Sequence, residues 1–98
     1  MYETLTDLQR RRLQNGLSRQ LRRRWLITAN REDKEAIRTV MNDDFLMSLL
    51  SMEAAAVYAN AGQAESPFVD AILKMLMFFI ENWEIILEII RAISGSHL

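Results

Sequence analysis

Residues 68–93 read FVDAILKMLMFFIENWEIILEIIRAI, and the helical periodicity of this run indicates the fold class. On a helical wheel at roughly 100° per residue, its charged residues all fall within one sector of roughly 100°. Aliphatic and aromatic side chains occupy most of the remaining circumference. Because an ordinary surface helix needs an apolar stripe only about 100° wide, the run predicts a helix that is covered by neighbours on three sides.

Capping residues and helix breakers indicate the boundaries of the other helices. Gly62 can end one helix, and Ser66 followed by Pro67 suits the start of the next. Asn30 is a good N-cap ahead of an acidic first turn. With one proline and three glycines in 98 residues, the chain is otherwise composed largely of helix-forming residues. The sequence therefore predicts a small all-α bundle in a single domain, 1–98, with three main helical segments at 1–29, 32–60 and 67–94.

Two of these segments place apolar residues on two different faces, which predicts a break in each. In the first segment, Leu8 points about 160° away from the stripe formed by the later leucines, so we expect a bend near Asn15-Gly16. In the middle segment, the face that carries Ile37 and Val40 is offset from a second apolar face by well over 90°. That second face comprises Phe45, Leu46, Leu49, Met52 and Ala56. A new N-cap within Asn42-Asp43-Asp44 would reconcile the two faces. We expect helices over 4–14, 17–29, 32–41, 43–60 and 67–94.

The apolar run also predicts self-association, because a monomer of this length has few helices with which to cover it and large exposed apolar areas are unusual in monomers. The alternative is that the run forms the central helix of a monomeric bundle. Attachment to a membrane surface is disfavoured, since the polar face carries four acidic residues. Asn82 falls within the apolar sector, where a buried amide can fix the register or the number of associating helices. The alternative is that Asn82 lies at the rim of this sector and is solvated. The predicted interface is formed by Phe78, Phe79, Asn82, Trp83, Ile86 and Ile90.

A second feature is the arginine-rich N-terminus. Residues 1–24 contain seven arginines and two acidic residues, a net charge of +5, whereas the whole chain has a net charge of −1. Leucines recur at every fourth position from Leu13 to Leu21, and arginines occupy the opposite side of the helix. Guanidinium groups match phosphate geometry, and residues 19–25 have the composition of short arginine-rich RNA-binding helices. Candidate contacts to nucleic acid or to an acidic partner are Arg11, Arg12, Arg19, Arg22, Arg23 and Arg24.

Two other interpretations of these arginines remain open. They form a solvated face, or they pair with Glu81, Glu84 and Glu88, either within one subunit or between subunits. The isoelectric point of the chain, about 5.8, is low for a dedicated nucleic-acid-binding domain, and no helix-turn-helix, zinc-finger or RNA-recognition motif is present.

Residue types that support catalysis or metal binding are scarce. The absence of cysteine excludes disulfides, thiol nucleophiles and thiolate metal sites. The single histidine, His97, cannot supply the Glu-x-x-His pairs of dinuclear carboxylate sites, and Asp43-Asp44 suits helix capping better than cation binding. The sequence therefore predicts a non-enzyme with no catalytic residue, no cofactor and no metal.

The longest run without a charged residue, 54–64, is too short for a membrane span, which needs about 20 apolar residues. No export signal is evident, so we expect a cytoplasmic location. The sequence favours a non-catalytic helical interaction protein with a structural, adaptor or regulatory role. We expect this protein to form a homo-oligomer, and a further protein partner is a second option. The alternative is an RNA- or DNA-binding protein that displays its arginine-rich helix on such an oligomer.

Overall fold

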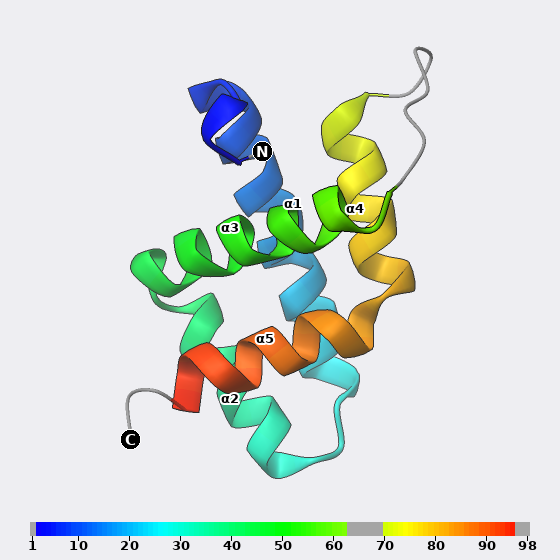
Figure 1. Cartoon of the computed structure of the whole chain (residues 1–98). Coiled ribbons are helices and arrows are strands. Elements are labelled where there is room, and N and C mark those ends of the chain that lie inside the picture. The colour runs from blue at the N-terminus through cyan, green and yellow to red at the C-terminus, as the bar shows by residue number, and fades with distance from the viewer. Residues whose placement is uncertain (1, 63–69, 96–98) are drawn as a thin grey trace.

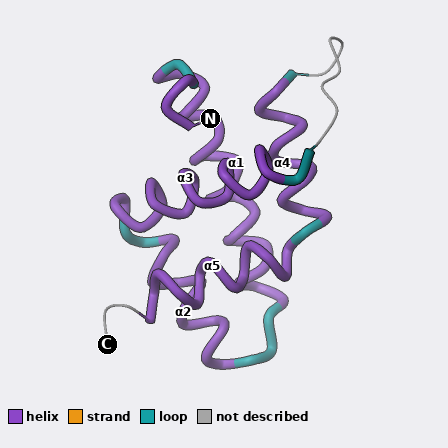
Figure 2. Tube along the Cα trace, in the orientation of Figure 1, coloured by secondary structure: helices purple, strands orange, loops and turns teal. Residues whose placement is uncertain are grey.

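The computed structural model describes residues 2–62 and 70–95, and this part of the chain is all-helical, which confirms the predicted class (Figure 1). Short loops join α1 to α2, α2 to α3 and α4 to α5, as the trace coloured by secondary structure shows (Figure 2). The elements are the 3₁₀ helix η1 (Tyr2–Thr4) and the α-helices α1 (Asp7–Ile27), α2 (Arg31–Met41), α3 (Asp44–Asn60), α4 (Ala71–Glu81) and α5 (Trp83–Gly95).

Side-chain caps lie at the starts of α1, α2, α3 and α4. The Asn30 side chain accepts a hydrogen bond from the backbone N–H of Asp33 at 3.0 Å, as predicted for the start of α2. Asp43 Oδ1 accepts from the N–H groups of Phe45 and Leu46, which confirms the predicted break between α2 and α3. At the end of α3, Gly62 has a φ of +64°, a left-handed conformation that terminates helices and that glycine adopts without steric cost.

The predicted bend in the first segment is wrong, because α1 is one continuous helix through Asn15-Gly16. Leu8 does not reach the core and remains 64% exposed. Gly16 serves a different purpose from the expected one. A Cβ at this position would clash with Leu76 Cδ1, so the missing side chain allows α4 to approach α1 closely.

The prediction of a single helix over 67–94 is also wrong. The segment breaks at Asn82, where α4 ends and α5 begins. The Phe78 carbonyl accepts two hydrogen bonds from Asn82, one from its backbone N–H at 2.9 Å and one from its side-chain Nδ2 at 2.8 Å. Asp70 caps the start of α4, and the predicted capping pair Ser66-Pro67 lies outside the described residues. The break lets α4 and α5 bury their apolar faces in two different directions.

The core draws side chains from all five α-helices. Phe79 from α4 is completely buried, together with Leu17 of α1, Ile37 of α2, Leu50 of α3 and Ile90 of α5. Helix α5 lies against α2 and α3, whereas α4 packs mainly on α1 and stands at the edge of the molecule (Figure 1). The chain itself therefore supplies much of the cover that the apolar C-terminal run requires.

Helix α3 turns a different face to the core from the one that its sequence suggests. Its buried residues are Leu46, Met47, Leu50, Ser51, Ala54, Ala55 and Tyr58. Two members of the predicted apolar face, Phe45 and Met52, are 72% and 42% exposed. Because apolar residues surround α3 on nearly all sides, the sequence pattern alone did not identify the inward face.

None of the helices within 2–62 and 70–95 combines the length and the apolar character that a membrane-spanning helix requires.

Candidate functional site: the arginine face of helix α1

Helix α1 provides a long, well-anchored scaffold for the arginines. Thr6 and Gln9 form a reciprocal capping box, with Gln9 N–H donating to Thr6 Oγ1 at 3.1 Å and Thr6 N–H donating to Gln9 Oε1 at 2.9 Å. The helix contains 21 residues, which corresponds to a length of about 30 Å.

The two sides of α1 differ sharply in environment. Leu13, Leu17 and Leu21 are completely buried on the inner side. The outer side is solvent-exposed and carries Arg11, Arg12, Arg19, Arg22 and Arg23. Thus the predicted segregation of leucines and arginines is present in the fold, and five of the six predicted arginines share the exposed side.

Three arginines of α1 contact other elements of the fold. Arg10 donates to the carbonyls of Tyr2 and Glu3, and its guanidinium lies 5.1 Å from the centre of the Tyr2 ring. Arg24 lies over the ring of Trp83, at 4.9 Å from the centroid. Arg12 forms an ion pair of 3.1 Å with Asp70 at the start of α4, and this hydrogen bond lowers the pKa of the Asp70 carboxyl.

The other arginines of the exposed side have no ion pair or side-chain hydrogen bond with any residue that the structure describes; they are Arg11, Arg19, Arg22 and Arg23. The pairing with Glu81, Glu84 and Glu88 that the sequence left open is therefore not made within the described chain. Arg91 is the cation whose charge interacts with Glu84 and Glu88, which helps to raise its pKa.

Two shallow grooves border the arginine face. One has a volume of about 240 Å³ and is lined by Asn15, Ser18, Arg19 and Arg22. The other lies between α1 and α4, with a volume of about 190 Å³, and its lining includes Arg12 and Leu73. The sequence analysis missed Asn15 and Ser18 as lining residues. Asn15 lies four residues before Arg19, and Ser18 lies four residues before Arg22. This spacing places them on the same helix face as the arginines, and the pattern would have identified them.

The predicted oligomer-interface residues occupy the interior of the chain. Five of them, Phe78, Phe79, Trp83, Ile86 and Ile90, are at most 9% exposed and belong to the core. The sixth, Asn82, is half-buried at the junction of α4 and α5. An oligomer interface formed by these six residues stays a prediction. The exposed large apolar residues of α4 are Leu73, Met77 and Ile80.

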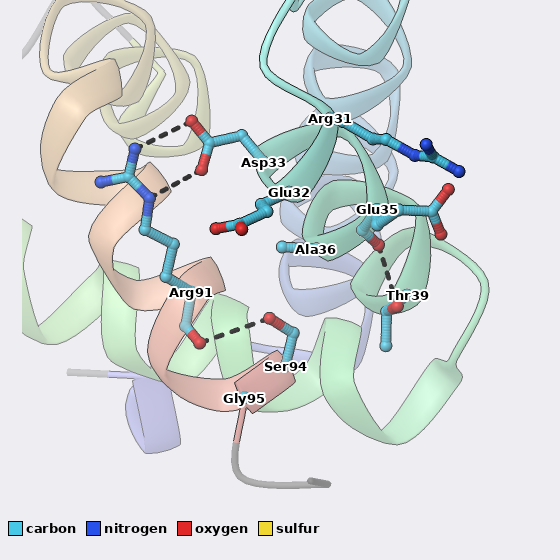
Figure 3. A pocket seen from close by; sticks show the side chains of 9 residues that line it. All are labelled: Arg31, Glu32, Asp33, Glu35, Ala36, Thr39, Arg91, Ser94 and Gly95. Atoms are coloured by element: carbon cyan, nitrogen blue, oxygen red, sulfur yellow. Dashed lines mark hydrogen bonds and ion pairs between the residues drawn. The ribbon is translucent and has the colours of Figure 1, made fainter.

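An open crevice of about 720 Å³ lies between α2 and α5 (Figure 3). Asp33 faces Arg91 across it and accepts two hydrogen bonds, from Nε at 2.8 Å and from Nη2 at 2.9 Å. Hydrogen bonding to Arg91 lowers the pKa of Asp33 and raises that of Arg91. Arg31 and Glu35 also line the crevice, and their side chains extend away from Arg91 (Figure 3). The sequence analysis missed this pair, since its members are 58 positions apart and no local pattern links them.

Within the described ranges, no group of three or more histidines or acidic residues is arranged to hold a metal ion. The predicted absence of catalytic residues, cofactors and metals stays a prediction, and His97 lies outside the described residues. Searches among models of protein families, curated proteins and solved structures found no match to this chain.

Proposed function

We propose that this protein is a non-catalytic binding protein whose α1 arginine face contacts the phosphate backbone of nucleic acid. The observation that carries the proposal is the state of Arg11, Arg19, Arg22 and Arg23, which are exposed on one side of a single helix and have no acidic partner among the described residues. Self-association, the first expectation from the sequence, concerns a different surface and different residues.

The geometry supports backbone binding rather than the recognition of bases. From Arg11 to Arg23 the face extends about 18 Å along the helix, which allows contacts to several successive phosphates. Guanidinium groups bind phosphate oxygens in a bidentate manner, and Asn15 and Ser18 between them add neutral hydrogen-bonding groups. Because residues 1–24 carry +5 while the remainder of the chain is acidic, positive charge is concentrated in the segment that contains most of α1.

Salt dependence of binding tests the proposal directly. Four phosphate contacts predict that the logarithm of the duplex DNA association constant falls with a slope of about −3.6 against log salt. Between 50 and 200 mM salt, affinity then falls about 150-fold. Fluorescence anisotropy with short duplex and single-stranded DNA and RNA, each of several sequences, would measure both the slope and any sequence preference.

A matched pair of variants shows whether the arginines of α1 bind the nucleic acid. Replacing Arg22 and Arg23 by Gln removes two contacts and should reduce the slope for duplex DNA by about 1.8. Replacing Arg31 and Arg38, two exposed arginines of α2, by Gln changes the net charge equally and should leave binding nearly unchanged. Equal loss in both variants, or no binding to any of the probes at about 20 mM salt, would contradict the proposal.

A further inference from the structure

Helix α4 exposes an apolar stripe that the fold leaves uncovered. Leu73, Met77 and Ile80 are 51%, 49% and 53% exposed. Their spacing of four and three residues places them on one side of the helix, and Leu76 lies half-buried beside them. The opposite side of α4 is packed into the core through Met75 and other residues. Helix α4 thus has two apolar surfaces: one is buried in the core, and the other, the stripe, is exposed.

We propose that the occupant of this stripe is a second copy of the chain, packed antiparallel on α4 about a two-fold axis. The stripe is symmetric about the midpoint between Leu76 and Met77. An antiparallel partner centred on this point sets Leu73 opposite Ile80 of the partner subunit, and Leu76 opposite Met77 of the partner subunit. Each contact occurs twice, as the isologous interface of a two-fold dimer requires.

Charge complementarity favours a second copy over an unrelated apolar partner. Lys74 and Glu81 are seven positions apart, so they lie on the same edge of the stripe, and neither has an ion-pair partner among the described residues. In the antiparallel arrangement, Lys74 lies about 3 Å along the helix axis from Glu81 of the partner subunit. The dimer therefore contains two ion pairs along one edge, each between Lys74 of one subunit and Glu81 of the other.

The exposed apolar face of α3 lacks this property. Phe45 and Met52 are exposed there, but the charged residues of α3 are Asp44 and Glu53, both acidic. A two-fold contact through α3 would bring carboxylates together with no cation from the same helix. The observations thus favour α4 over α3 as the self-association surface.

The dimer has a consequence for the arginine face. Gly16 of α1 lies beside Leu76 of α4, on the edge of the stripe opposite Lys74 and Glu81. A two-fold axis perpendicular to α4 leaves both α1 helices on the same side of the dimer, so the two arginine faces lie together. The dimer itself does not depend on nucleic-acid binding, and its test uses the protein alone.

Sedimentation equilibrium over a range of protein concentrations tests the dimer. The monomer mass is 11.4 kDa, and the expected dimer has about twice that mass. Met77→Glu should give a monomer at concentrations where the unaltered protein is dimeric, since it places two carboxylates near the two-fold axis. Met52→Glu is the matched control, because it makes the same replacement at a methionine of similar exposure on α3. Circular dichroism should show both variants folded.

A charge exchange tests the arrangement of the two subunits. Lys74→Glu or Glu81→Lys alone should raise the dimer dissociation constant by about 2- to 30-fold, since each turns two attractive pairs into repulsive ones. The double variant restores the pairs and should return the constant to near its original value. A monomer at all concentrations up to about 1 mM overturns the proposal, as does a dimer that survives Met77→Glu. Loss of the dimer with Met52→Glu alone would assign the interface to α3.

Discussion

Helix α1 continues through a glycine at its centre, whereas the C-terminal segment breaks at Asn82 within a mainly apolar run. The faces that each segment must bury explain this difference. Helix α1 has one inner stripe, Leu13 to Leu21, and a straight helix directs all of it to the core. The C-terminal run is apolar around most of its circumference, and the break at Asn82 gives its two halves separate directions in which to bury side chains. The need to bury apolar faces therefore outweighs the local helix propensity of a single residue.

The strongest test of the C-terminal segment is Phe79→Ala. Phe79 is completely buried, so its truncation should lower the free energy of unfolding by about 3–5 kcal/mol. The neighbouring Ile80→Ala should change it by less than about 0.5 kcal/mol, because Ile80 is 53% exposed. Urea denaturation, at a concentration where the protein is monomeric, measures both values. Similar losses in the two variants would show that α4 presents a different face to the core.

Gln20 is a buried polar residue on the inner face of α1. It is 8% exposed, and neither its Nε2 nor its Oε1 has a hydrogen-bond partner among the described residues. Burial of an unsatisfied amide is costly, so Gln20→Met should raise the free energy of unfolding by about 1–2 kcal/mol. The midpoint of thermal unfolding reports the gain. A loss of stability would mean that the amide makes a hydrogen bond in the folded protein.

The close approach of α1 and α4 at Gly16 is tested by a double-mutant cycle. Gly16→Ala favours the helix by about 1 kcal/mol, but its Cβ clashes with Leu76, and we expect a net loss of about 1 kcal/mol. With Leu76→Ala as the background, the same change should stabilise the protein by about 1 kcal/mol. Chemical denaturation of the four proteins gives the coupling energy. Equal effects in both backgrounds would show that the two residues do not touch.

The junction between α4 and α5 depends on the Asn82 side chain. Asn82→Ala removes the hydrogen bond to the Phe78 carbonyl and should lower the free energy of unfolding by about 1 kcal/mol. Asn82→Asp keeps the size of the side chain but removes the donor, so it should be at least as destabilising. Thermal unfolding distinguishes this result from a neutral one, which would mean that packing alone maintains the break.

The smallest expected effect is the acid sensitivity of the contact that joins α5 to α2. Because Arg91 lowers the pKa of Asp33 in the folded protein, the ion pair stabilises the fold fully above the unfolded pKa of Asp, near 3.9. The contribution is lost as the pH falls from there through the lowered folded value. Asp33→Asn should therefore show a smaller decrease in unfolding free energy between about pH 6 and pH 3. Glu32→Gln, which removes the same charge beside it, serves as the control.

The sequence by itself determined the helical class, the cap at Asn30, a second cap within Asn42-Asp43-Asp44, and the separation of arginines from leucines on α1. These features depend on contacts within a few residues, and periodicity and capping preferences report such contacts directly. The candidate nucleic-acid face could be predicted for the same reason, since its arginines lie on one helix.

Only the tertiary structure decided which apolar surfaces are buried and where the helices break. The inward face of α3, the break at Asn82 and the burial of Phe78 and Trp83 depend on neighbours distant in the sequence. The same holds for the absence of acidic partners for Arg19 and Arg22 among the described residues and for the pairing of Asp33 with Arg91. A helix that is apolar on nearly all sides gives no local preference between its faces, so the packing of the whole chain selects the face that is buried and the one that remains in water.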